Sequence, residues 1–227
     1  MFCMIKFAVK FLFLLIVFSG MGGIKVSAET KSSAVVQQSS KKLYERGFKD
    51  FERGKYRRAI ENFLSLLEIE PNNHQAYNMI GMSFGELEEY SPAIAAFERA
   101  IALDQNFANA YYNRGHAYKE LGRFDLALID FNQALELTEG KHISALVNRS
   151  TIYALRENYP SAIADLNRVA EFKPDEAIAY YNRALIYLTM GDKEAYLEDL
   201  TVAEKLYREA GDRAGLAQIE KVREFDY

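Results

Sequence analysis

The chain of 227 residues is poor in the residues that interrupt helices, since it contains only four prolines and thirteen glycines. It also lacks runs in which apolar and polar residues alternate, the pattern of a half-buried strand. Both absences favour helices over sheet. The apolar and charged fractions are ordinary, at 49% and 26%, which excludes disorder of the chain as a whole.

Cysteine is almost absent, because Cys3 is the only one. Three histidines, His74, His116 and His142, have no acidic or cysteine partner at the spacing of metal ligands, so we expect no metal site. The chain has no phosphate-binding glycine loop, nucleophile elbow or zinc-protease helix motif. We therefore expect no catalytic residues, no cofactor and no small-molecule substrate.

The net charge of the chain is −4, so its surface is acidic overall. Non-specific nucleic-acid binding needs a basic surface, so this balance gives no support for a nucleic-acid partner.

The first 28 residues differ from the rest. Two lysines precede an apolar run over residues 11–18, and small residues then lead to the sequence Val26-Ser27-Ala28. This order is typical of a cleaved secretory signal peptide of residues 1–28, which predicts export to a periplasm, a thylakoid lumen or the extracellular space. The alternative is an uncleaved membrane anchor of residues 7–24. Cleavage would remove three lysines and no acids, changing the net charge from −4 to −7, and would leave no cysteine.

Residues 29–39 are rich in serine and glutamine and show no apolar period, which predicts a flexible linker.

From residue 40 onward, the chain repeats itself every 34 residues. Small residues recur in register with a phenylalanine: Gly47, Gly81 and Gly115; Ala59, Ala93 and Ala127; Phe63, Phe97 and Phe131. Two helices approach closely only where side chains are small, so this period predicts stacked helical pairs that share one core.

The clearest copy places Tyr111, Gly115, Tyr118, Gly122, Phe124, Ala127, Phe131 and Ala134 in order. In this pattern the chain resembles the tetratricopeptide repeat family. The resemblance implies an all-α, right-handed superhelix (α-solenoid) of antiparallel helix pairs. It gives five repeats, at 40–73, 74–107, 108–141, 143–176 and 177–210, and a C-terminal capping helix at 211–227, with one extra residue in the turn before the fourth repeat. Among the positions that depart from the family pattern, Asp50 replaces an aromatic residue, where we expect it to face solvent, and Tyr196 replaces a small residue.

Comparison of the repeats with one another predicts an ion pair inside three of them. An arginine is followed sixteen residues later by an aspartate in repeats three, four and five, whereas repeat two has the apolar residues Ile80 and Ala96 at these places. Charge goes with opposite charge and apolar with apolar, as expected for two positions that touch. The predicted structural pairs are Arg114 with Asp130, Arg149 with Asp165 and Arg183 with Asp199.

The first helices of such repeats line a concave face, and an asparagine precedes each of the three arginines. In the family such asparagines hold the backbone of a bound peptide, which an amide can do because it both donates and accepts. The alternative is that they serve packing or face water. Helical spacing projects the following residues onto this predicted peptide-binding groove: Tyr44, Phe48, Phe51, Asn78, Met82, Tyr112, Asn113, His116, Lys119, Asn148, Thr151, Tyr181, Asn182, Leu185 and Leu188.

The groove offers few lysines and arginines, so it does not favour a clamp for a terminal carboxylate. The sequence thus predicts an exported scaffold that binds an unidentified protein or peptide in its concave groove. One alternative is a membrane-anchored assembly factor for a membrane protein complex, and another is a regulatory subunit of an enzyme.

Overall fold

The computed structural model describes residues 25–224, with side chains described from residue 35 onward. Within this range the chain forms eleven helices joined by short turns. They are α1 (Lys25–Glu52), α2 (Tyr56–Ile69), α3 (His74–Glu86), α4 (Tyr90–Leu103), α5 (Ala108–Glu120), α6 (Phe124–Leu137), α7 (Ile143–Leu155), α8 (Tyr159–Phe172), α9 (Ala177–Met190), α10 (Lys193–Ala210) and α11 (Arg213–Glu224).

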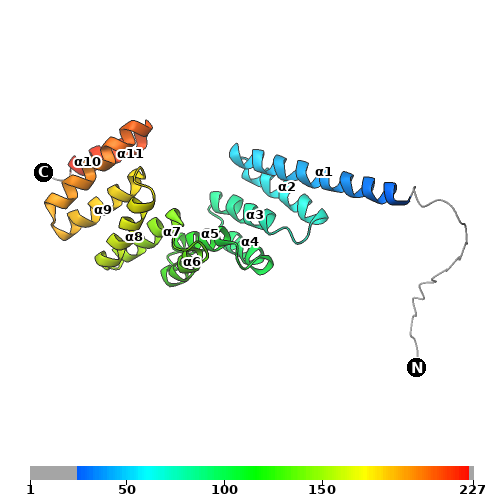
Figure 1. Cartoon of the computed structure of the whole chain (residues 1–227), viewed down its shortest axis with the longest axis horizontal. Helices are drawn as coiled ribbons and strands as arrows, with labels where there is room; N and C mark the ends of the chain where they lie inside the picture. The colour runs from blue at the N-terminus through cyan, green and yellow to red at the C-terminus, as the bar shows by residue number, and fades with distance from the viewer. Residues whose placement is uncertain (1–24, 225–227) are drawn as a thin grey trace, which may run out of the picture.

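The helices pack in consecutive antiparallel pairs that form a right-handed superhelix, seen in Figure 1 as an open arc. Each even-numbered helix packs on the helix before it. In addition, α3 contacts α5, α5 contacts α7 and α7 contacts α9, whereas the even-numbered helices of the described chain make no comparable contacts with one another. Neighbours on the inside of a curve lie closer than neighbours on the outside. The odd-numbered helices therefore form the inner face of the arc, and the even-numbered helices form its outer face.

Each pair is held by a small residue on the first helix and a large residue on the second. A Cβ atom added to Gly81 would lie 2.5 Å from Cε1 of Phe97, and one added to Gly115 would lie 2.9 Å from Cε1 of Phe131. Both phenylalanines are buried. Repeats four and five use other combinations at these places: Ser150 with Leu166, and Ala184 with Leu200. A larger first residue is thus accompanied by a smaller second one.

The turns between the two helices of a repeat share one backbone conformation. One residue in each has a positive φ, between 59° and 80°: Gly54, Glu88, Gly122, Glu157 and Gly191. Glycine adopts this left-handed conformation without strain, while glutamate does so at a cost. The extra residue before repeat four lies in the turn between α6 and α7, as the sequence predicts. There, the carbonyl of Gly140 accepts a hydrogen bond from Arg168 at 3.1 Å.

The structure corrects the predicted linker at 29–39, because these residues belong to α1. The reason is that no glycine or proline interrupts the chain between residue 25 and Gly47, so a helix fixed by its packed end continues toward the N-terminus. Val35 and Val36 are exposed in this extension. Residues 1–24, which hold most of the predicted signal peptide and the whole alternative anchor, lie outside the described residues. No helix within residues 25–224 is long and apolar enough to cross a membrane.

Asp50 and Tyr196, which depart from the family pattern, are both buried. Asp50 is only 8% exposed and accepts a hydrogen bond from Asn62 at 3.1 Å, so the prediction that it faces solvent is wrong. The amide provides the partner that a buried carboxylate requires. Tyr196 is fully buried in a cluster with Ala177 and Ala184, and α9 and α10 still pack closely. The larger side chain is therefore accommodated within the pair.

The last helix covers the open end of the array. Ile219 of α11 is buried against the cluster that contains Tyr207, and a Cβ atom on Gly215 would lie 2.3 Å from Cδ1 of Tyr207. Burial, together with the nearby charge of Asp212, raises the pKa of Tyr207 to about 12. The helix thus occupies the place predicted for the cap.

Candidate functional site

The three arginine–aspartate pairs that the sequence predicts are present and bidentate. Nε and Nη2 of the arginine donate to the two carboxylate oxygens, at 2.8 and 2.7 Å for Arg114 with Asp130. The distances are 2.8 and 2.6 Å for Arg149 with Asp165, and 2.7 and 2.6 Å for Arg183 with Asp199. The aspartates are buried, so each pair joins the two helices of its repeat from within the core.

Two of these arginines also connect neighbouring repeats. Nη1 of Arg149 donates to Asn132 of α6 at 2.5 Å, and Nη1 of Arg183 donates to Asn167 of α8 at 2.5 Å. The hydrogen bond to its aspartate raises the pKa of Arg183 above its ordinary value, which keeps the guanidinium charged. The donors of Arg149 and Arg183 are directed at side chains of the array, so these two guanidinium groups hold neighbouring repeats together.

All fifteen predicted groove residues lie on odd-numbered helices. Tyr44, Phe48 and Phe51 belong to α1; Asn78 and Met82 to α3; Tyr112, Asn113, His116 and Lys119 to α5; Asn148 and Thr151 to α7; Tyr181, Asn182, Leu185 and Leu188 to α9. The whole predicted set therefore belongs to the helices that form the inner face, but its members are not equivalent.

Some of the predicted groove residues mainly pack against their own repeat. The ring of Tyr44 lies 5.6 Å from that of Phe63, and the ring of Phe51 lies 5.5 Å from that of Tyr56. At the other end of the array, Tyr181 lies 6.5 Å from Tyr207, ring to ring. Phe48 and Leu188 are exposed. Tyr44, Phe51 and Tyr181 thus contribute to the packing at the two ends of the array.

The asparagines of the inner face make different contacts. Nδ2 of Asn113 donates to Oδ1 of Asn78 at 2.9 Å, which links α5 to α3. Asn148 accepts from Nζ of Lys119 at 2.7 Å, and its Nδ2 lies 3.4 Å from the hydroxyl of Tyr112. These contacts join adjacent helices, as the packing alternative foresees. For Asn182, the structure places the side chain at the wall of a pocket.

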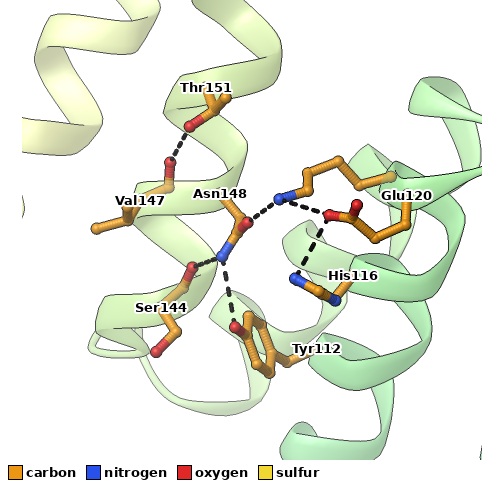
Figure 2. Close-up of polar contacts among 8 residues, drawn as sticks. Tyr112, His116, Glu120, Ser144, Val147, Asn148 and Thr151 are labelled. Carbon is orange, nitrogen blue, oxygen red and sulfur yellow. Dashed lines mark hydrogen bonds and ion pairs between the residues drawn. The ribbon is translucent and has the colours of Figure 1, made fainter. Parts of the chain in front are cut away.

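A polar cluster fills the middle of the inner face, and its residues come from α5 and α7 (Figure 2). Its members are Tyr112, His116, Lys119, Glu120 and Asn148. Nζ of Lys119 lies 3.2 Å from Glu120, and Nε2 of His116 lies 3.6 Å from the same carboxylate. Burial lowers the pKa of His116 and raises that of Tyr112, so both rings are neutral near pH 7.

Two pockets open on the inner face, one on each side of this cluster. The α3–α5 pocket, of about 310 Å³, is lined by Met82, Gly85, Glu86, Tyr90, Phe97, Tyr112, Asn113, His116 and Ala117. The α7–α9 pocket, of about 250 Å³, is lined by Ser150, Thr151, Ala154, Leu155, Tyr159, Asn182, Leu185, Ile186 and Thr189. Seven of the fifteen predicted groove residues line one or the other.

Gly85, Glu86, Ala154 and Leu155 also line these pockets but are not among the predicted groove residues. All four lie in the last turn of their helices, three or four residues after the predicted residues Met82 and Thr151. Residues three and four apart share a face of a helix. Extending the helical spacing by one more turn would have found them.

Comparisons with known proteins agree with this architecture. A family model described as TPR repeat matches residues 81–122 and 151–191, and two models described as tetratricopeptide repeat match residues 108–139 and 177–210. Together they cover more than half of the chain, which therefore belongs to the tetratricopeptide repeat family. No curated protein sequence matches the chain.

Several solved structures share the fold. PilF of Pseudomonas aeruginosa matches with a TM-score of 0.70 and 15% identity, over 85% of this chain and 93% of that one. YrrB, described as a TPR protein with an unusual peptide-binding site, gives 0.61 and 23%, over 86% and 98%. The first TPR of Spaghetti (RPAP3), bound to an HSP90 peptide, gives 0.51 and 27%, over 53% and 94%.

Proposed function

We propose that this protein is a scaffold that binds a partner protein through an extended peptide segment lying along the inner face of the array. The observation that carries the proposal is the pair of pockets between odd-numbered helices. Pockets that combine apolar walls with a few polar groups are typical of ligand sites. YrrB and the RPAP3 domain, which share the fold, are described as binding peptides, which supports the same role here.

The inner face suits an extended chain better than a charged terminus. Amide and hydroxyl groups of Asn113, Thr151 and Asn182 alternate with apolar walls along it. Such groups can pair with the unpaired backbone of an extended peptide, while the pockets receive its side chains. Binding, without chemistry on the ligand, is the function proposed for this face, and the family relationship points the same way.

The proposal is tested by selecting binders from a displayed library of random twelve-residue peptides. Peptides retained by the wild-type chain should be lost by Leu185→Arg, which blocks the α7–α9 pocket, and by His116→Arg, which blocks the α3–α5 pocket. The matched control is Ile129→Arg on the outer helix α6, where the side chain is exposed. If the control loses the same peptides as the two groove variants, or if no peptide depends on either variant, the inner face is not the binding site.

We further propose export across a membrane, supported by the order of charged, apolar and small residues in residues 1–28. The second candidate, a membrane-anchored assembly factor, would keep residues 7–24. The mass of the mature protein separates the two: loss of residues 1–28 supports export of a free scaffold. Retention of the full chain in a carbonate-washed membrane fraction supports the anchored form.

A further inference from the structure

The two pockets of the inner face are copies of one site. Adding 69 residues, which is one 34-residue step and one 35-residue step, carries Met82 to Thr151, Gly85 to Ala154 and Asn113 to Asn182. Every one of these six residues lines its pocket. The fold therefore repeats the same hollow between α3 and α5 and again between α7 and α9.

A third hollow of this kind would lie between α5 and α7, but a lysine takes its place. The position of Gly85 and Ala154 is occupied there by Lys119, whose side chain is only 20% exposed and reaches across to Oδ1 of Asn148 at 2.7 Å. At Gly85, by contrast, an added Cβ atom would meet nothing within 4 Å. The residue at this single position thus decides whether the hollow is open.

We infer that the inner face takes an extended peptide with two apolar anchor side chains, one in each pocket, that lie six residues apart. This inference rests on the proposed function and specifies the ligand of the same face. Because Lys119 fills the site between them, the residues between the anchors pass over a polar surface and do not enter a pocket.

The spacing follows from helix geometry. Packed helices lie about 8–10 Å apart, and the two pockets are separated by two such steps, which gives about 16–20 Å. An extended chain advances about 3.3–3.6 Å per residue, so this distance corresponds to about five or six residues. Side chains of an extended chain alternate between two sides, and only an even separation points both anchors at the inner face.

Charge complementarity fixes which end of the peptide is basic. Glu86 lines the α3–α5 pocket and accepts a hydrogen bond from the neutral hydroxyl of Tyr56, at 3.1 Å. In the described part of the chain no lysine or arginine forms an ion pair with it. The α7–α9 pocket has no charged side chain in its lining, and Leu155 stands at the place of Glu86. A lysine or arginine therefore belongs beside the anchor that enters the α3–α5 pocket.

The test uses synthetic fluorescein-labelled peptides of glycine and serine that carry two leucines, two to eight residues apart, and one arginine next to one leucine. Fluorescence anisotropy with the full chain should show the tightest binding at a separation of six. The gain over a peptide with one leucine should be about tenfold, the effect of burying one further leucine. Glu86→Gln should remove the gain from the arginine and leave the gain from the leucines.

Two variants fill the pockets without disturbing the fold. Gly85→Leu places a side chain in open space on a helix, and Ala154→Leu enlarges a residue that lines the other pocket. Each should reduce the affinity for the best peptide about tenfold and leave the melting temperature at or above that of the wild type. The control is Ala164→Leu, an exposed position on the outer helix α8, which should leave the affinity unchanged.

The outcomes separate this inference from the proposed function. Affinity that does not depend on the leucine spacing, or that survives both filling variants, overturns the two-anchor inference. If library peptides still depend on Leu185 and His116 in that case, peptide binding by the inner face stands. If no library peptide depends on them either, both proposals fail.

Discussion

Replacing Gly81 or Gly85 by alanine should change the stability of the array in opposite directions, although the two glycines lie one turn apart on α3. A methyl group added at Gly81 would approach Cε1 of Phe97 to 2.5 Å, a distance that real Cβ atoms do not adopt, whereas one added at Gly85 would meet nothing within 4 Å. Alanine gains about 0.5–1 kcal/mol over glycine inside a helix. Overpacking a filled core costs about 1–3 kcal/mol. We therefore expect Gly81→Ala to lose about 1–2 kcal/mol net, and Gly85→Ala to gain up to about 1 kcal/mol.

Urea unfolding followed by circular dichroism measures both changes, and the second variant is the control for the first because it differs only in what the methyl group meets. The double variant Gly81→Ala with Phe97→Leu adds a rescue, since repeat five carries the combination Ala184 with Leu200. Its stability should exceed the sum of the two single effects by about 0.5–3 kcal/mol. Equal gains from both glycine substitutions would refute the close contact between α3 and α4.

Three further changes test the packing by urea unfolding. Burial lowers the pKa of His142, whose Nδ1 accepts from the amide of Ala145 at 3.2 Å. The unfolded chain therefore binds this proton more tightly, and stability should fall as the pH drops below the ordinary pKa of histidine. His142→Asn keeps an acceptor at this N-cap and should remove that part of the pH dependence, so an unchanged profile would contradict the assignment. Asp130→Ala should lower the free energy of unfolding by about 3–5 kcal/mol because it leaves the guanidinium of Arg114 unpaired. Adding Arg114→Ile reproduces the apolar pair of repeat two and should recover most of the loss. If it recovers none, an apolar pair cannot replace the ion pair at these positions. Glu88→Gly should raise stability by about 1 kcal/mol, and a loss would mean that the strained turn has another role.

The repeat period made the helical pairs predictable because the same contact must form in each unit. The arginine–aspartate pairs could be predicted for a related reason. Three repeats have opposite charges at the two positions, and repeat two has the apolar residues Ile80 and Ala96, so the two positions vary together. In the structure, Ile80 and Ala96 lie in one buried cluster, at the place that Arg114 and Asp130 take in the next repeat. Positions that touch within a helix pair can therefore be recognised when the pair is repeated, because their residues vary together from one repeat to the next.

The extension of α1 and the partner of Asp50 could not be predicted by the same reasoning, because neither is repeated. A segment rich in serine and glutamine is compatible with a linker or with a helix, and the packed end of α1, where Ser40 is buried, decides between them. Asp50 similarly depends on Asn62, which stands where the three repeats with an internal ion pair carry their aspartate. Such features depend on neighbours that no period identifies.

On the inner face, the position that determines the predicted ligand is one where the repeats differ. The contacts within each pair of helices use only a few combinations of small and large residues, because the two helices of every repeat must pack closely. At the position held by Gly85, Lys119 and Ala154, the glycine and the alanine line open hollows, whereas the lysine fills the hollow between them. Selectivity for a peptide can therefore be encoded here by the order in which open and filled sites follow one another along the arc.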